Sequence, residues 1–413
     1  MTDEKQKQIR SFSGFTIATT VSQVLMMVYS LLLARYFGPE ISGGYTAVYS
    51  LTSLTSIAFS LGLDNWLLRN AVLSQKPSSA LGGVIKIKTI SGVIWGVLLF
   101  FIAVTVRPDL YSPNLLIICI IDVWFDSVFH SILTIFNVQR KVKKYSLFLI
   151  FSRATKLLSL LILIILKDQN ILHFAFWRGF TSFIFVVLLL VVFRPDMGRD
   201  DEFSFSNVLS QSRSFALSEI LATIYMQMDV VILANTRGST ATGIYSPALN
   251  LINALFVVPS ALYSYFMPSL TKKHETDKQK FVSMSKQVIK ILLILGVGLT
   301  LGVVVVGKPL ANFLLGEKFY ESGRLMELMS PILIMKSLEF GFVSIIVAMN
   351  KQSDRLLPQT IGALANIGLN IMLIPKYGET GAAFVYLITE AIIFVSYGII
   401  VVKNMKKLRE RST

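Results

Sequence analysis

The sequence LARYFGPEISGGY, residues 33–45, returns in altered form as LANTRGSTATGIY at residues 233–245. The two stretches align without a gap and share a leucine, an alanine, two glycines and the final tyrosine. Each follows one long apolar run and precedes another. Glycine adopts backbone conformations that other residues avoid, so the shared glycines suit a tight connection between neighbouring helices. The repeat therefore predicts a duplicated chain, with the same connection at the same point of each half.

The composition indicates a membrane protein. The chain has 413 residues, of which 54% are hydrophobic and only 15% are charged. Soluble domains carry about a quarter charged residues. Apolar runs recur along the whole length, and about 20 helical residues cross a bilayer. These totals predict an integral membrane protein with many spans.

Twelve runs are long enough to span the membrane, which predicts an all-α fold of two six-helix bundles. The predicted spans are 14–35, 43–64, 81–106, 112–136, 145–166, 171–193, 209–235, 241–268, 287–314, 325–349, 357–375 and 380–402. Six spans per half is an even number, so both halves enter from the same side and form parallel repeats. The predicted parts are an N-terminal lobe (1–195), a cytoplasmic linker (196–208), a C-terminal lobe (209–402) and a basic tail (403–413). The first run has no small-residue cleavage pattern after it, so we expect it to be retained.

Basic residues set the predicted orientation. The chain has a net charge of +15, and most of its 39 lysines and arginines fall in alternate connections. Examples are RKVKK at 140–144 and KKLRER at 406–411, and Lys86 and Lys88 are predicted to lie on the same side. Lysine and arginine concentrate in cytoplasmic loops, so both termini are predicted to be cytoplasmic. The same rule explains the positive charge without nucleic acid as a partner.

Charged residues nevertheless occur inside the predicted spans. They are Asp122, Asp126, Arg153, Lys156, Arg178, Glu219, Asp229, Lys336, Glu339 and Glu390. Each costs about 2.5–3.5 kcal/mol at the centre of a membrane helix, so these side chains are expected to face protein or water. In CIIDVWFDSVFHS (119–131), Asp122, Asp126 and His130 are four residues apart and form one stripe on a helix.

Five motifs in order along the predicted spans resemble those of Wzx-type oligosaccharide flippases. They are LARYFGPEISGGY (33–45), MDVVIL (228–233), GIYSPA (243–248), FMPSL (266–270) and PKYGETGAA (375–383). This polysaccharide transporter family belongs to the superfamily that includes the multidrug and toxin extrusion (MATE) transporters and the lipid II flippases. The resemblance covers nearly the whole chain.

The resemblance implies a MATE-like fold with a central cavity between the two bundles. It also implies a cargo, a polyprenyl-pyrophosphate-linked oligosaccharide that is flipped from the inner to the outer leaflet of a bacterial or archaeal cytoplasmic membrane by alternating access. The products would be surface polysaccharides such as O-antigen, capsule or exopolysaccharide. A polysaccharide polymerase would be a partner.

The intramembrane bases are the candidate contacts for such a cargo. A diphosphate needs hydrogen-bond donors, and guanidinium groups bind it in bidentate fashion. The predicted anion site therefore consists of Arg153, Lys156, Arg178 and Lys336. In the alternative interpretation these bases only pair with acids and fix the bundles, as Lys336 and Glu339 would do three residues apart.

Two roles are open to the acids Asp122, Asp126, Glu219, Asp229 and Glu390. They either hold the bases in place while the cavity is empty, or they titrate and couple transport to H+ or Na+. His130 either joins a proton relay or is simply packed. One cysteine and three histidines in separate segments give no metal-ligand spacing, and no cofactor is predicted.

Two other function classes compete with the flippase. A MATE-type cation or drug antiporter would use the acids and has little need for four intramembrane bases. A membrane-embedded sugar transferase or polymerase would need a sizeable loop for its chemistry, and the predicted outer loops are short.

Overall fold

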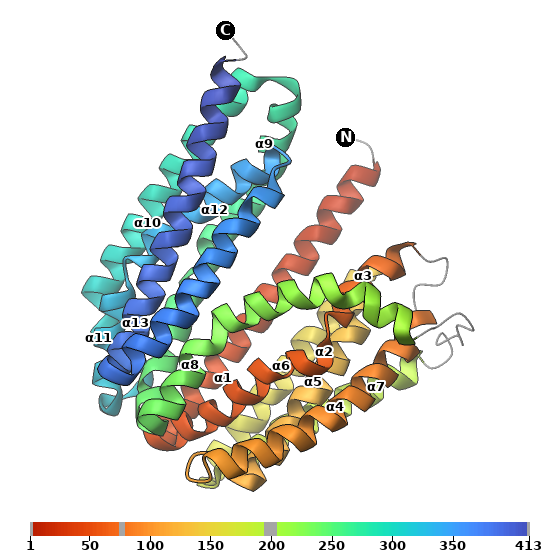
Figure 1. Cartoon of the computed structure of the whole chain (residues 1–413), viewed down its shortest axis with the longest axis vertical. Coiled ribbons are helices and arrows are strands. Elements are labelled where there is room, and N and C mark those ends of the chain that lie inside the picture. The colour runs from red at the N-terminus through yellow and green to blue at the C-terminus, as the bar shows by residue number, and fades with distance from the viewer. Residues whose placement is uncertain (1–2, 74–78, 194–204, 411–413) are drawn as a thin grey trace. The chain divides into compact units, whose positions relative to one another are not determined.

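The computed structural model describes residues 3–73, 79–193 and 205–410, and within them every regular element is a helix (Figure 1). The elements are α1 (Asp3–Thr55), α2 (Ile57–Ser60), α3 (Leu63–Leu73), α4 (Ser79–Val106), α5 (Pro113–Val138), α6 (Val142–Ile165), α7 (Ile171–Phe193), α8 (Phe205–Leu255), α9 (Val257–Thr276), α10 (Lys278–Leu315), η1 (Glu317–Phe319), α11 (Tyr320–Met329), α12 (Ile332–Ala348), η2 (Gln352–Arg355) and α13 (Leu356–Glu410). The predicted all-α fold class is confirmed.

The chain forms two compact units, Met1–Gln227 and Met228–Thr413, and the boundary between them in the sequence falls within α8. Unit 1 includes the first part of α8, where the side-chain amide of Gln227 donates to the Ser53 hydroxyl at 3.2 Å. The predicted linker, 196–208, lies mostly outside the described residues. The predicted limits of the lobes therefore stay a prediction.

Three long helices each consist of two helices that meet at one glycine. Gly38 in α1 has φ 76° and ψ 174°, and Gly238 in α8 has φ 82° and ψ −169°. Gly378 divides α13 in a similar way, and α1 and α13 both turn back in Figure 1. This region of backbone space is accessible almost only to glycine. The repeated motif thus forms the same break twice. The sequence predicted a longer connection at each of these points, whereas the structure has a single non-helical residue.

Hydroxyl groups complete this shared geometry. The Ser42 hydroxyl donates to the Gly38 carbonyl at 2.5 Å, and the Thr242 hydroxyl donates to the Gly238 carbonyl at 2.9 Å. In each copy the hydroxyl four residues after the break bonds back to the glycine carbonyl, as serine and threonine side chains often do within helices. The two copies of the motif are therefore alike in backbone and in local hydrogen bonding.

The helices are long and apolar enough for a multi-pass membrane protein. In the described residues eight qualify as membrane spans, or nine if the bent pair formed by Glu317–Met329 and Ile332–Ala348 is one span. Three of the eight contain the dividing glycines. The predicted count of twelve spans stays a prediction. The outer side of α4 exposes apolar residues such as Ile94 (58%) and Phe101 (63%), as a lipid-facing helix does.

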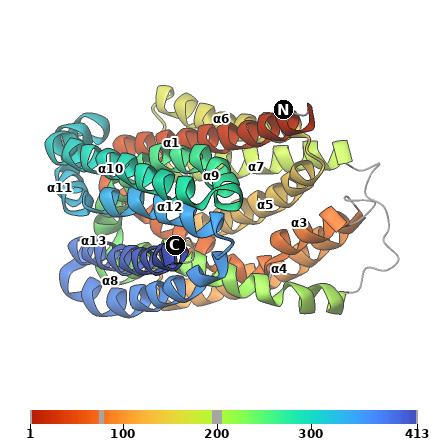
Figure 2. The same ribbon diagram turned by 90° about the horizontal axis from the view of Figure 1, so that it is seen from above.

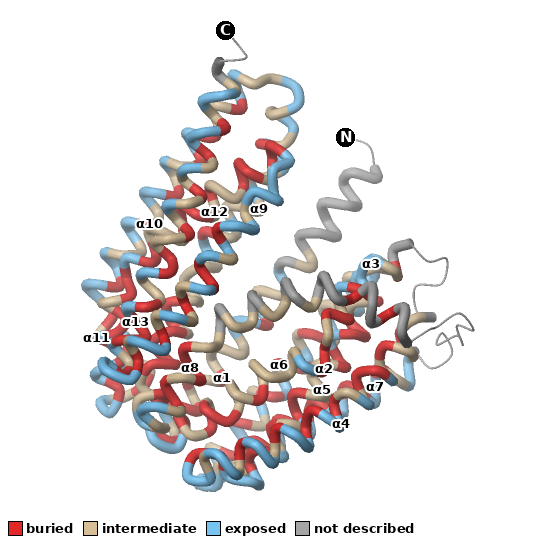
Figure 3. The backbone as a smooth tube through the Cα atoms, viewed as in Figure 1, coloured by how far each residue is buried: buried red, intermediate tan, exposed pale blue. Residues whose placement is uncertain are grey.

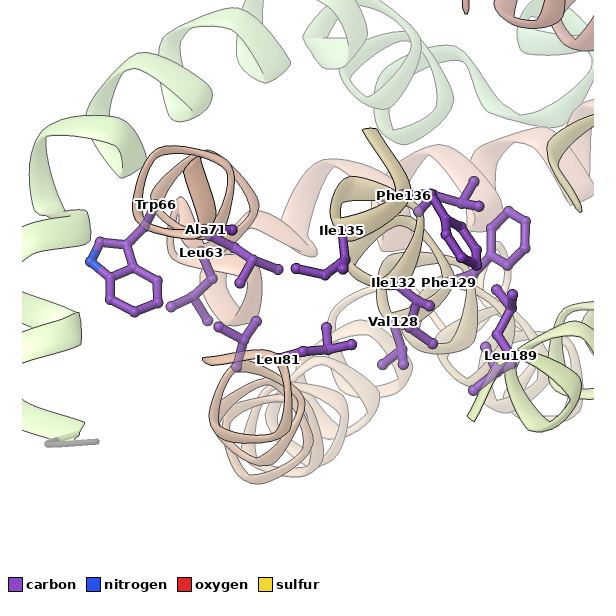
Figure 4. Packing of buried hydrophobic residues seen from close by; sticks show 14 of the residues in the cluster. Leu63, Trp66, Ala71, Leu81, Val128, Phe129, Ile132, Ile135, Phe136 and Leu189 are labelled. Carbon is purple, nitrogen blue, oxygen red and sulfur yellow. The ribbon is translucent and has the colours of Figure 1, made fainter. Parts of the chain in front are cut away.

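In unit 1, α5 is the central helix, and it contacts α1, α3, α4, α6 and α7. Ser112 precedes it, and Pro113 occupies the first helical turn, where its missing N–H is not needed. Its buried apolar residues include Val128, Ile132 and Phe136, which lie in the side-chain cluster of Figure 4. Figure 3 shows buried stretches along both α5 and α7. In a membrane such a core is stabilised by close packing, because lipid is as apolar as the side chains.

In unit 2, α12 packs against α9, α10 and α13, and Figure 2 shows α10 beside α12. A small residue allows the close contact between α10 and α12. A Cβ at Gly296 would lie 2.9 Å from the Ile334 Cα. The helix α10 begins at the cap residue Asp277, whose carboxylate accepts a hydrogen bond from the Lys280 amide at 2.9 Å.

Candidate functional site

Five charged side chains from three helices of unit 1 meet in one place, here called the α5–α7 charge cluster. It consists of Asp122 and Asp126 on α5, Arg153 and Lys156 on α6, and Arg178 on α7. Because α5 packs against both α6 and α7, its acidic stripe faces the bases of both helices. The predicted alignment of the two aspartates is confirmed, and three of the four predicted cargo-binding bases lie together.

Asp126 binds both bases of α6. Arg153 contacts it with two nitrogens, Nη1 to Oδ1 at 2.8 Å and Nη2 to Oδ2 at 3.2 Å. Lys156 Nζ lies 3.0 Å from the same Oδ1. The Asp126 side chain remains 19% exposed, whereas that of Lys156 is fully buried. The bidentate guanidinium pairing is the geometry with which arginine also binds phosphate.

Asp122 is more deeply buried than Asp126. The Ser182 hydroxyl donates to its Oδ1 at 2.7 Å, and Arg178 Nε lies 3.4 Å from its Oδ2. Lys156 Nζ approaches Oδ1 at 3.8 Å. The Asp122 side chain is only 4% exposed, so it joins α5, α6 and α7 in the interior of the unit.

Tyrosines from α1 enclose Arg178. Its Nη1 donates to the Tyr45 hydroxyl at 2.5 Å, and its guanidinium lies 3.9 Å from the centre of the Tyr49 ring. A cation over an aromatic face is attracted by the ring quadrupole. Its side chain is 5% exposed. In this state Arg178 is engaged by protein groups, and Arg153 is the more accessible guanidinium, with 10% of its side chain exposed.

His130 lies at the open end of the acidic stripe. Its side chain is 46% exposed, and its Nε2 lies 3.0 Å from Arg153 Nη2 and 3.5 Å from Asp126 Oδ2. Exposure therefore rises along α5 from Asp122 through Asp126 to His130.

The α5–α7 charge cluster carries excess positive charge. Three bases face two carboxylates, which leaves a net charge of +1 when all five groups are ionised. Charges taken out of water are costly unless paired and hydrogen-bonded. A buried excess of one positive charge at a partly open end is an arrangement suited to an anionic ligand.

A second buried pair in unit 1 was missed from the sequence. Lys88 Nζ contacts both carboxylate oxygens of Asp64, at 2.8 and 2.9 Å, and the Ser127 hydroxyl at 2.8 Å. Its side chain is fully buried, so the prediction that Lys88 belongs to a cytoplasmic connection is wrong. The available signal was its spacing from Lys86: residues two apart on a helix point to different sides, and only Lys86 is exposed.

Glu219 does not join the α5–α7 charge cluster. Its Oε1 accepts a hydrogen bond from the Ser60 hydroxyl of α2 at 3.2 Å, and among the described residues its buried Oε2 has no hydrogen-bond partner. The contact ties the first part of α8 to α2 within unit 1. Its predicted place in the cavity stays a prediction.

In unit 2, Lys336 and two glutamates form the α12–α13 charge cluster. Lys336 Nζ lies 2.8 and 2.6 Å from the two carboxylate oxygens of Glu390, and 3.2 Å from Glu339 Oε2. The predicted pairing with Glu339 is present, but the contacts with Glu390 are shorter. The Glu390 side chain is fully buried, and that of Glu339 is 7% exposed. One base and two acids give a net charge of −1 when all are ionised.

Asp229 meets the tyrosine of the repeated motif. The Tyr245 hydroxyl donates to Asp229 Oδ2 at 2.5 Å, and the Val230 amide donates to Oδ1 at 2.8 Å. Both residues are buried. This geometry fixes the end of the motif in unit 2, so a packing role for Asp229 is evident alongside any role in transport.

Comparisons with known proteins agree with the resemblance seen in the motifs. A family model described as polysaccharide biosynthesis protein matches residues 32–324. The capsular polysaccharide biosynthesis protein CapF of Staphylococcus aureus is 20% identical over 401 residues, which cover 94% of this chain and 98% of CapF.

Two solved transporters share the fold. The lipid II flippase MurJ in an inward closed conformation has a TM-score of 0.75 and 16% identity, over 95% of this chain and 89% of MurJ. A multidrug resistance transporter of the MATE family in an inward-facing conformation has a TM-score of 0.69 and 10% identity, over 96% of each chain. The family match spans well over half of the chain, and the MATE-like fold predicted from the motifs is confirmed. The chain therefore belongs to the polysaccharide biosynthesis protein family, and it has the fold of the flippases and extrusion transporters of the MATE-containing superfamily.

Proposed function

We propose that this multi-pass membrane protein flips a polyprenyl-pyrophosphate-linked oligosaccharide from the inner to the outer leaflet of a bacterial or archaeal cytoplasmic membrane. The observation that carries the proposal is the net positive, partly open α5–α7 charge cluster inside an apolar bundle. Membership of the polysaccharide biosynthesis family and the likeness to capsule and lipid II proteins support this class of cargo. The product would be a capsule, O-antigen or exopolysaccharide, with a polymerase acting after transport.

In this proposal the diphosphate binds at Arg153 and Lys156. Both side chains carry donors that already hold a carboxylate, and phosphate oxygens accept the same bonds. Arg178 keeps Asp122 and the tyrosines of α1 in place, so its role is to position the cluster. The polyprenyl tail stays in the bilayer, and alternating access of the two lobes moves the head group across with both termini on the cytoplasmic side.

The acids of unit 2 would couple transport of the cargo to H+ or Na+. The α12–α13 charge cluster has one more carboxylate than it has bases, so one monovalent cation would neutralise it. Glu339 Oε2 lies 3.2 Å from Lys336 Nζ, which brings the second carboxylate to the same base. Asp229 is a second candidate. Transport into vesicles under an imposed proton or sodium gradient tests this: Glu390→Gln should lose the dependence on one gradient, and an unchanged dependence would remove this cluster from coupling.

The test of the main proposal is transport by charge-removed variants. Arg153→Gln and Lys156→Gln each remove charge-assisted bonds to the cargo, worth about 1.5–3 kcal/mol apiece, so delivery of lipid-linked sugar to the outer leaflet should fall about tenfold or more. Arg107→Gln is the matched control, because Arg107 pairs with Asp109 in an exposed connection. Normal delivery by folded Arg153 and Lys156 variants would rule out this site.

A cation or drug antiporter is the alternative, and the net negative α12–α13 charge cluster is the observation that favours it. Binding by the purified protein separates the two functions. A flippase should bind farnesyl diphosphate and lose it in the Arg153 variant, whereas an antiporter should bind tetraphenylphosphonium and lose it in the Glu390 variant.

A further inference from the structure

We infer that Asp126 is an internal counter-anion whose place the diphosphate of the cargo takes, while Asp122 stays bound to the protein. The inference rests on the proposed function and assigns separate roles to two aspartates one helical turn apart. Asp126 would hold Arg153 and Lys156 when the site has no cargo, and it would take them back when the cargo leaves.

The two carboxylates differ in what anchors them. Asp122 accepts a hydrogen bond from Ser182 and pairs with Arg178, which is itself fixed by Tyr45. In the part of the chain that the structure describes, the side-chain contacts of Asp126 are with Arg153, Lys156 and His130. The first two are the proposed cargo ligands. Losing Asp122 would disturb three helices, whereas moving Asp126 disturbs the two proposed cargo ligands and the partly exposed His130.

Exposure gives the direction of exchange. Asp122 is 4% exposed, Asp126 is 19% exposed, and His130 beside it is 46% exposed. An anion arriving from water therefore meets the Arg153 and Asp126 end of the cluster before the Asp122 end. The Asp126 carboxylate can turn toward His130 and water without crossing the apolar core.

Electrostatics explains why such a group is needed. Two buried bases with no anion nearby would be strongly destabilising, so an empty site must supply its own negative charge. A diphosphate has more negative charge and more acceptor oxygens than one carboxylate, so it can displace Asp126 from the two bases. When the cargo dissociates, the Asp126 carboxylate returns to Arg153 and Lys156. Dissociation is then faster, because the two bases regain a counter-anion as the diphosphate leaves.

The first test is binding of farnesyl diphosphate to the purified full-length protein in nanodiscs. Asp126→Asn removes the competing charge and keeps the shape, so the probe should bind on the order of tenfold more tightly and dissociate more slowly. Asp126→Glu should stay near the wild type. Asp109→Asn is the matched control, since that aspartate pairs with Arg107 in an exposed connection. Equal or weaker binding by a folded Asp126→Asn protein would overturn the inference.

A second measurement uses the unmodified protein and so does not depend on the folding of a variant. A water-soluble carbodiimide with an amine labels accessible carboxyl groups, and mass spectrometry locates the label. Adding farnesyl diphosphate should raise labelling of Asp126 and leave Asp122 unlabelled. Unchanged labelling of Asp126 with bound probe would contradict the exchange.

The outcomes also separate the inference from the proposed function. If Arg153→Gln and Lys156→Gln bind the probe as the wild type does, the proposed cargo site is wrong. If they lose the probe while Asp126→Asn and the labelling are unchanged, the cargo site stands and only the exchange is wrong.

Discussion

The tyrosine that ends the repeated motif meets a base in one unit and an acid in the other. Tyr45 accepts a hydrogen bond from Arg178, whereas Tyr245 donates one to Asp229. The backbone breaks at Gly38 and Gly238, seven residues before these tyrosines, have nearly the same dihedral angles. The duplicated motif thus keeps its geometry but has opposite charge beside it.

The two charge clusters differ in the same sense. The α5–α7 charge cluster has three bases and two acids, and the α12–α13 charge cluster has one base and two acids. A phenol can either donate or accept, so the same tyrosine tolerates either partner. This difference in charge underlies the proposal that unit 1 binds the anionic cargo and unit 2 a small cation.

The largest effect should come from removing Lys336, the single base of the α12–α13 charge cluster. Lys336→Met takes the cation away from the fully buried Glu390 carboxylate. Breaking a buried ion pair by removing one partner costs about 3–5 kcal/mol, so the thermal midpoint of the protein should drop steeply at neutral pH. The double variant Lys336→Met with Glu390→Gln should recover much of this loss. If the single variant is as stable as the wild type, the α12–α13 charge cluster is not held together by this pair.

Removing a base from unit 1 should cost less, although Lys156 is the more buried lysine. Lys156→Met leaves Asp126 paired with Arg153 and Asp122 paired with Arg178, and the remaining four charges balance. We expect a loss of about 1.5–3 kcal/mol from its charge-assisted bond, measured by denaturation in the same detergent. A loss larger than that of Lys336→Met would contradict the assigned charge balance of the two clusters.

Part of this comparison could be predicted from sequence. The four-residue spacing placed Asp122 and Asp126 on one face, and the apolar surroundings of Arg153 and Lys156 marked them as buried. The enclosure of Arg178 by Tyr45 and Tyr49 could not be predicted, because α1 and α7 are far apart in the chain and meet only through packing.

The missed features have local causes. Lys88 lies near the start of α4, where composition does not separate a buried lysine from one that reaches the membrane surface. The break at Gly38 was expected to be a longer connection, because glycine-rich sequence is typical both of loops and of a one-residue break between helices. In both cases the tertiary partner decides the outcome, and no local pattern encodes it.

The repeated glycines should behave alike, unlike the charges around them. Alanine at Gly238 would meet no atom within 4 Å, so its cost is that of the backbone conformation alone. Forcing a residue with a Cβ into this region costs about 1–3 kcal/mol. We expect Gly38→Ala and Gly238→Ala to lower the thermal midpoint by similar amounts. A loss confined to one of them would show that the two breaks are not equivalent.

The smallest effect concerns Asp277, an exposed carboxylate that gives a baseline for the buried ones. The pKa of Asp277 lies below its usual value. The larger cause is the hydrogen bond from the Lys280 amide, and the smaller is the contact with the Lys280 side chain. Because the pKa of Asp277 is lower in the folded than in the unfolded state, its carboxylate stabilises the folded protein above the unfolded-state pKa, near 4. This stabilisation is lost as the pH falls through the folded-state pKa.

Asp277→Asn keeps the cap without the titration, since asparagine caps a helix as well as aspartate does. Between about pH 5 and pH 2, the wild type should therefore lose slightly more thermal stability than the variant. Lys280→Gln removes the ion pair but keeps the amide bond, so it should narrow this difference only in part. Parallel pH profiles for wild type and Asp277→Asn would mean that the cap contributes no titratable stability. A change in the thermal midpoint as large as that of Lys336→Met would mean instead that ion pairs at the surface of this protein are as strong as those in the two buried clusters.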